Sequence, residues 1–291
     1  MLRNLALMLV VVCGCRALST VQTLAGDKSF STLVSLVTQA GLVDTLNGGT
    51  FTIFAPNNAA FAALPAATLQ AVQNDAALLK SVLLYHVVAK RVLRASLNNE
   101  HKETSAQGKP IRFNDYNHNH VRTAEGVKIL AFDKICDNGV IHTLAGVMMP
   151  PDGDIVNIVS NHNETSTLLS LAVAAGIASA LQADGLTLFA PTNDAFAKIP
   201  AATVAQLTGN IPLLTEVLKY HVIPHTEFSA GLWDGQMLRT LDGTSITVHA
   251  RNGVTLNSGS HVTKADIGAT NGVVHYIDTV LIPTRVLGII G

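Results

Sequence analysis

The stretch TFTIFAPNNAAFAALP, residues Thr50–Pro65, occurs a second time in the chain as LTLFAPTNDAFAKIP, residues Leu186–Pro200. Three ordered repeats indicate duplication of one large unit, because a chance match would not keep the order. The other two repeats are LLKSVLLYHVV with LLTEVLKYHVI, at Leu78–Val88 and Leu213–Ile223, and NGVIHTLAGVMMP with NGVVHYIDTVLIP, at Asn138–Pro150 and Asn271–Pro283.

The spacing between matching residues gives the size of the repeated unit. Phe54 and Phe189 are 135 positions apart, and His142 and His275 are 133 positions apart. A nearly constant spacing requires a unit of roughly 130 residues, which is the size of a domain and far longer than a solenoid repeat. The chain therefore contains two similar domains in tandem.

Each unit changes its hydrophobic pattern part-way along the chain. The early part repeats apolar residues at helical spacing, as in Ser29–Leu46, and the late part alternates, as in Val127–Phe132. The repeated block predicts a short buried strand, a stop at Ala-Pro, and a helix capped by Asn57 or Thr192. Helices followed by strands predict an α+β fold for each unit.

The FAP-(T/N)-N-x-A-F block, the Tyr-His pair and the closing N-G-V-(V/I)-H block resemble the fasciclin (FAS1) domain family in both halves. The resemblance implies two tandem FAS1 domains, each a β-sandwich-like wedge flanked by short helices. We expect a signal peptide at 1–17, a first domain at 18–150, a linker at 151–154, a second domain at 155–286 and a tail at 287–291.

Composition and charge exclude several classes of protein. The 291 residues are 48% hydrophobic and 13% charged, which is typical of a folded chain. A net charge of −1 argues against a nucleic-acid binder. Residues 18–151 hold 11 basic and 9 acidic side chains, whereas residues 152–291 hold 6 and 11. This asymmetry suggests weak head-to-tail self-association as a hypothesis.

The first residues resemble an export signal. Arg3 precedes the apolar run Leu5–Val12, and Cys15 and Ala17 are small residues at the positions that a signal peptidase reads. Eight apolar residues are too few to span a bilayer. We predict a secreted, extracellular protein without a transmembrane segment. The alternative is a bacterial protein in the periplasm, or one anchored to the surface by a lipid on Cys15.

Only Cys136 remains after cleavage behind Ala17, so the cleaved chain cannot form an internal disulfide. An odd cysteine in a secreted protein can pair with another molecule. The second unit has Ala269 at the matching position, which favours a small buried residue instead.

The Tyr-His pairs are the first candidate binding residues. The resemblance links Tyr85-His86 and Tyr220-His221 to integrin recognition in animal FAS1 proteins. Both histidines also continue the apolar stripe of a predicted helix, so a buried, hydrogen-bonded histidine is the alternative. The later histidine of each unit alternates with apolar residues along a strand, which predicts a structural role for it.

Asp266-Ile267 is the second candidate, because it lies five residues before an Asn-Gly pair, at the place of the Asp-Ile motif that the resemblance links to integrin binding. A loop carboxylate can complete the coordination of a divalent cation held by a receptor. In the first unit Asp133 is followed by Lys134, so we expect binding to favour the second unit. A capping or solvated Asp266 is the alternative.

Other motifs give weaker signals. His118 and His120 would share one face of a strand and could supply two metal ligands, but the spacing shows no third ligand, which favours a polar hairpin tip. We therefore predict no metal site. Asn163-Glu164-Thr165 is a glycosylation sequon, with Asn163 as the acceptor. The chain shows no motif for catalysis or cofactor binding, so we predict a protein that is not an enzyme and needs no cofactor.

These observations predict a secreted protein of cell adhesion or the extracellular matrix. Its partners would be a cell-surface receptor such as an integrin, or matrix proteins. The alternative function is a soluble or lipid-anchored carrier of a lipid or small hydrophobic ligand. Attachment of cells that depends on divalent cations would favour adhesion, and a large apolar cavity would favour the carrier.

Overall fold

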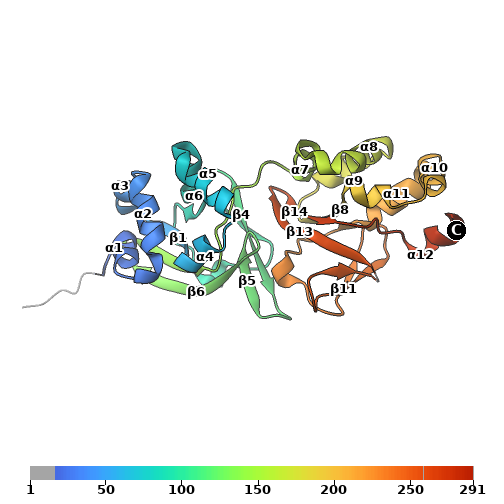
Figure 1. The fold of residues 1–291 in the computed structure, drawn as a ribbon. Helices are drawn as coiled ribbons and strands as arrows, with labels where there is room; N and C mark the ends of the chain where they lie inside the picture. Colours follow the sequence, from blue (N-terminus) through green and yellow to red (C-terminus); the bar gives the residue numbers. More distant parts are fainter. Residues whose placement is uncertain (1–16, 258, 291) are drawn as a thin grey trace, which may run out of the picture.

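The computed structural model describes residues 17–257 and 259–290. Residues 1–16 of the predicted signal peptide, Cys15 among them, lie outside the described residues. Two units of α+β structure lie side by side, the first coloured blue to green and the second yellow to red (Figure 1). The fold class and the tandem arrangement predicted from the sequence are confirmed.

The first unit has six short α-helices on a seven-stranded sheet with the order β2-β1-β7-β6-β5-β4-β3. The helices are α1 (Thr20–Ala25), α2 (Ser31–Gln39), α3 (Val43–Asn47), α4 (Asn58–Ala62), α5 (Ala66–Asn74) and α6 (Ala76–Tyr85). The strands are β1 (Phe51–Pro56), β2 (Val87–Val88), β3 (His101–Thr104), β4 (Pro110–Tyr116), β5 (Val121–Ala124), β6 (Val127–Cys136) and β7 (Gly139–Leu144).

The second unit repeats this order, with its own seven-stranded sheet in the order β10-β11-β12-β13-β14-β8-β9. Its helices are α7 (Ile155–Asn161), α8 (Ser166–Ala174), α9 (Asn193–Ala197), α10 (Ala201–Thr208) and α11 (Ile211–Tyr220), followed by α12 (Thr284–Ile290). Its strands are β8 (Leu186–Pro191), β9 (Val222–Ile223), β10 (Met237–Arg239), β11 (Ser245–His249), β12 (Thr255–Leu256), β13 (Ser260–Ala269) and β14 (Gly272–Ile277).

The repeated block folds as the sequence predicts. The side chain of Asn57 accepts a hydrogen bond from the amide of Ala60 at 2.8 Å and so caps α4. Thr192 caps α9 in the same way. The strand before each cap is buried, with Phe54 and Phe189 fully shielded from solvent. The block thus sets the first strand of each sheet and the helix that follows it.

Each Asn-Gly pair stands where the last strand of its unit begins, and its glycine does not have the left-handed backbone of a tight turn. The first strand runs parallel to the last strand, and a Cβ atom on Gly139 would lie 2.0 Å from the carbonyl oxygen of Phe51. Glycine is therefore required by close backbone approach. The Asn138 side chain accepts from the Thr20 amide at 2.8 Å and donates to the Leu46 carbonyl at 2.8 Å, which ties α1 to the sheet.

Apolar side chains fill both faces of each sheet. In the first unit one cluster packs the helices against the sheet around Leu79 and Ile141, and a second covers the other face around Phe113. Cys136 is buried at the edge of the helical cluster, with its Sγ 3.3 Å from Oγ1 of Thr23. This burial agrees with the small-residue interpretation of Cys136.

The two units meet through reciprocal contacts between an aromatic side chain and a glycine. Phe228 of the second unit packs on Gly126 of the first, where a Cβ would lie 2.4 Å from the ring. Tyr116 of the first unit packs on Gly231 of the second, with the corresponding distance 2.3 Å. The Tyr116 hydroxyl also accepts a hydrogen bond from the Phe228 amide at 2.9 Å. We call this contact region the seam.

Charged groups add to the seam. The buried Arg112 pairs with Glu100 of its own unit and with Asp184 of the second unit, at 2.6 Å for Asp184. Glu100 in turn accepts from the backbone amide of Thr226 at 3.1 Å. Basic groups of the first unit thus meet acidic groups of the second within one chain. Part of the charge asymmetry seen in the sequence is used for this internal contact.

Replacing Gly139 by Ala should lower the free energy of unfolding by about 3 kcal/mol or more, because the added methyl group would collide with the Phe51 carbonyl. Urea denaturation of the purified protein measures this change. Gly26→Ala is the control, since the nearest atom to a Cβ there lies at 3.5 Å and the backbone is right-handed helical. Equal stability of both variants would contradict the close-approach argument.

Candidate functional site

The tyrosine of each Tyr-His pair lies inside the fold. Tyr85 is fully buried, and its hydroxyl donates to the Pro110 carbonyl at 2.8 Å. Tyr220 donates to the Ser245 carbonyl at 3.1 Å and accepts from the amide group of Asn257 at 3.0 Å. Burial raises the pKa of both tyrosines. Neither ring is presented to a partner molecule.

The histidine of each pair links the end of a helix to the segment behind the last strand. The Nδ1 atom of His86 donates to the Val82 carbonyl at 2.8 Å, and its Nε2 accepts from the Met148 amide at 3.0 Å. His221 makes the same two bonds, to the Val217 carbonyl and from the Leu281 amide. The two rings are 3% and 0% exposed, which supports the buried alternative.

These bonds fix the charge of the two rings. A backbone amide can only donate, so the Nε2 atom that accepts from it must be unprotonated. A protonated ring would set two N–H groups against each other. Burial lowers the pKa of His86 and of His221 to about 4. Both rings are therefore neutral at physiological pH.

Asp266 lies in an irregular part of β13, where the pairing with β14 shifts register. Its backbone is left-handed, with φ of 61°, and its amide donates to Nδ1 of His275 at 3.1 Å. The Asp266 carboxylate accepts from the Ser229 amide at 2.7 Å and from the Ser229 hydroxyl. The Asp266 side chain thus caps the short helical turn Ser229–Gly231 and is still 31% exposed.

The first unit builds the same bulge with Asp133. Its φ is 56°, its amide donates to Nδ1 of His142 at 3.2 Å, and its carboxylate accepts from the Arg94 amide at 2.8 Å. The two units differ at the next residue. Lys134, which follows Asp133, carries a half-exposed ammonium group 3.9 Å from the Asp27 carboxylate, whereas Ile267 packs against the core of the second unit. The aspartates are equivalent, and their neighbours differ in charge.

The sequence pattern of the fasciclin domain matches residues 28–150 and 163–283. The chain belongs to the fasciclin (FAS1) domain family. The match covers both units, in agreement with the resemblance found from the repeated blocks.

Individual relatives come from animals and bacteria. The transforming growth factor-beta-induced protein ig-h3 of Sus scrofa is 35% identical over 81% of this chain and 35% of its own length. Human periostin is 31% identical over 81% of this chain and 28% of its own length. The immunogenic protein MPB70 of Mycobacterium bovis is 32% identical over 45% of this chain and 69% of its own length. The chain thus spans about a third of the two longer relatives.

Among solved structures, the FAS1 domain pair of the insect cell adhesion molecule fasciclin I is similar, with a TM-score of 0.44 and 16% identity. The alignment covers 89% of this chain and 98% of that chain. Neither the family nor any of these relatives is named for a catalytic activity, in agreement with the prediction of a protein that is not an enzyme.

The weaker sequence signals lie on the surface. His118 stacks on Trp233 across the seam, with ring centroids 3.8 Å apart, and His120 lies in the turn between β4 and β5. The hairpin-tip interpretation therefore describes both histidines. Within the described part of the chain, no three His, Cys, Asp or Glu side chains converge to hold a metal ion. Asn163 is exposed just ahead of α8, so glycosylation there stays a prediction.

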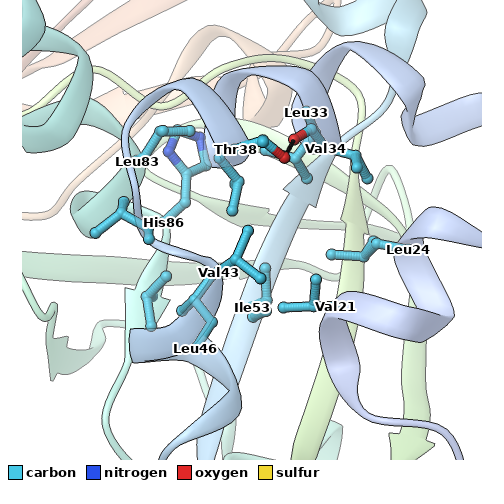
Figure 2. A pocket seen from close by; sticks show the side chains of 13 residues that line it. Val21, Leu24, Leu33, Val34, Thr38, Val43, Leu46, Ile53, Leu83 and His86 are labelled. Atoms are coloured by element: carbon cyan, nitrogen blue, oxygen red, sulfur yellow. Dashed lines mark hydrogen bonds between the residues drawn. The ribbon is translucent and has the colours of Figure 1, made fainter.

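A small apolar cavity lies beneath the first three helices (Figure 2). Aliphatic side chains of α1, α2 and α3 surround it, and Ile53 of β1 and Leu83 of α6 close it. Its volume is about 30 Å³, whereas a single water needs about 10–15 Å³. This cavity has no room for a lipid and does not favour the carrier alternative.

Across residues 17–257 and 259–290, no helix is long and apolar enough to cross a bilayer.

Acidification should destabilise the protein through the buried histidines. The unfolded chain binds protons near pH 6.5, whereas folded His86 and His221 resist protonation down to about pH 4. Between these values the unfolded state binds more protons, so stability rises with pH and is lost as pH falls. Each ring contributes up to roughly 3 kcal/mol. Urea unfolding at pH 7 and pH 4.5 measures the loss.

Glu125 acts in the opposite direction and must be separated from this effect. Burial raises the pKa of Glu125 to about 7. Between about pH 4.5 and pH 7 the folded state therefore binds more protons at this carboxyl than the unfolded state, so this carboxyl makes the protein more stable as the pH falls. The loss of stability between pH 7 and pH 4.5 is therefore measured in two proteins, the Glu125→Gln variant and the double variant Glu125→Gln with His221→Gln. An unchanged pH dependence after removal of His221 would contradict the assignment.

Proposed function

We propose that the chain is a secreted adhesion protein whose second unit binds a cell-surface receptor through Asp266 and Ile267. Membership of the FAS1 family supports an adhesive role, since FAS1 proteins such as ig-h3 and periostin are proteins of adhesion and the extracellular matrix. The observation that carries the proposal is the geometry of Asp266. Its carboxylate is held by Ser229 and is still about a third exposed at a bulge that fixes its direction.

The difference between the units supports the second one as the binding unit. In the first unit Lys134 follows Asp133 and adds a positive charge to this surface, which would repel a receptor-held divalent cation; its ammonium group lies 3.9 Å from the Asp27 carboxylate. The residue after Asp266 is Ile267, whose side chain is uncharged, and the ammonium group of the nearby Lys264 lies over the ring of Tyr276. A carboxylate also keeps unused lone pairs while it accepts the two bonds from Ser229. The cap and the receptor contact are therefore compatible.

The Tyr-His pairs stabilise the fold of each unit and are not themselves the receptor contact that we propose. Tyr220 and His221 of the second unit, like Tyr85 and His86, are buried and hydrogen-bonded, so their substitution would act on stability.

Export to an oxidising compartment is compatible with the buried free thiol of Cys136. A glycan on Asn163 would stand on the exposed turn ahead of α8. Matrix proteins are the other class of partner that the family suggests.

Asp266→Asn should reduce attachment of animal cells to the purified protein at least tenfold, measured as the coating concentration for half-maximal attachment. The amide keeps an oxygen for the Ser229 amide, and the Ser229 hydroxyl can turn to accept from the new NH₂ group. The cap is retained and only the charge is removed. The melting temperature should therefore change by no more than about 2 °C.

Asp133→Asn is the matched control, because it makes the same change in the equivalent bulge. It should leave attachment unchanged. Chelation of divalent cations should abolish attachment to the wild type. Equal losses from both variants, attachment that survives chelation, or no attachment to well-folded wild type would each overturn the proposal.

A further inference from the structure

A second cleft lies at the seam and has a composition unlike the small apolar cavity. It has a volume of about 480 Å³, within the range of small-molecule sites, which occur preferentially between domains. The first unit contributes the turn between β5 and β6, the second contributes α7 and β13, and the linker segment closes one side. Its apolar lining includes Val127, Met149, Ile158 and Ile267.

Glu125 is the carboxylate that the first unit turns toward this cleft. Its Oε1 atom accepts from the Arg112 amide at 2.6 Å. Its Oε2 atom faces the second unit, 3.4 Å from where a Cβ on Gly268 would lie. The Tyr85 hydroxyl, Arg112 and Lys102 are the charged or titratable groups of its own unit that act on it. Burial keeps the pKa of this carboxyl at about 7 despite them.

The second unit shows what the fold itself requires at this position. Asn257 is the structural equivalent of Glu125: its side chain accepts from the Thr247 amide at 3.1 Å and donates to Tyr220. Both residues also have the same left-handed backbone, with φ of 49° and 52°. A neutral amide therefore satisfies the hydrogen bonds of this turn. The negative charge of Glu125 is extra to the fold and lies where the second unit closes over it.

The charges around the cleft select the kind of ligand. Three carboxylates line it, those of Glu125, Asp152 and Asp266, against one ammonium group, that of Lys264. Lys264 already lies over the ring of Tyr276, 5.5 Å from its centroid. Such a lining attracts a cation and repels an anion. Apolar walls beside the carboxylates further favour a ligand with a hydrocarbon body.

We propose that the cleft at the seam binds a small aliphatic amine, with the ammonium group paired to Glu125 and the hydrocarbon chain against Val127, Met149 and Ile267. Asp152 and Asp266 add to the negative potential. This inference does not rest on the adhesive function, because it concerns a free small molecule and uses no receptor.

Three probes of equal length separate charge from apolar contact: n-hexylamine, 1-hexanol and hexanoate, titrated calorimetrically into the full chain at pH 8. The expected order of affinity is hexylammonium, then hexanol, then hexanoate. Shortening the amine from hexyl to butyl should weaken binding about fifteenfold, since each of the two methylenes removed contributes about fourfold. Tighter binding of hexanoate than of hexylammonium would overturn the proposal, and so would no binding of hexylammonium at millimolar concentration.

Glu125→Gln and Lys264→Met should act in opposite directions on hexylammonium. Glu125→Gln imitates Asn257, so the fold is kept while affinity falls at least tenfold. Lys264→Met removes the opposing charge and should tighten binding about threefold. Hexanol, which has no charge, should bind both variants as it binds the wild type. Loss of hexanol binding in Glu125→Gln would show that the substitution acts only through structure, and the assignment would be wrong.

The pH dependence supplies a second readout. An ammonium group pairs with the ionised form of Glu125, so the wild type should bind hexylammonium several-fold more weakly at pH 5.5 than at pH 8. His162 and Lys264 of the second unit also face the cleft, and they are retained in Glu125→Gln. The pH dependence should vanish in that variant. If it persists, another group controls it and Glu125 is not the partner of the amine.

Discussion

Each unit depends on the parallel pairing of its first strand with its last. The pairing β1–β7 joins residues that are almost ninety positions apart in the sequence, and it brings the backbone at Gly139 against Phe51. The last strand carries a histidine whose Nδ1 accepts from the amide of the bulge aspartate. The same pairing therefore closes the sheet and sets the left-handed conformation of Asp266. The candidate binding residue is a consequence of how the unit closes.

Buried histidines then join the elements around this strand pair. His86 accepts through Nε2 and donates through Nδ1, whereas His142 uses the reverse arrangement, donating to the Val92 carbonyl and accepting from the Asp133 amide. Each ring satisfies one backbone donor and one backbone acceptor away from water. A neutral ring is the only form that fits both bonds. This explains why the histidine of the Tyr-His pair is buried in both units.

Local signals in the sequence were sufficient for much of the fold, and signals that depend on tertiary contacts were not. Strand, Ala-Pro stop and Asn57 cap follow one another within a few residues, so the pattern alone predicted them. The helix at Thr20–Ala25 was missed because it is one short turn whose position depends on Asn138, far away in sequence. Arg112 is buried in the seam, and no local pattern distinguishes it from the exposed basic residues nearby in the sequence, because its partner Asp184 belongs to the other unit. Asp266 was found only through the family resemblance, since no local pattern reveals its left-handed backbone.

Duplication shows which side chains the fold needs and which it merely tolerates. Positions inside each unit keep their chemistry, as with the paired histidines, while positions at the seam differ. Glu125 of the first unit is equivalent to Asn257 of the second, and Glu227 of the second unit is equivalent to Val92 of the first. Glu227 is buried, and one of its carboxylate oxygens has no hydrogen-bond partner. A buried carboxylate oxygen without a hydrogen bond costs stability, whereas valine at the same place does not. Because the other copy of the unit folds with Asn257 and Val92 at these positions, neither Glu125 nor Glu227 is required for the fold of a unit, which is why we look for the role of Glu125 in the cleft that it faces.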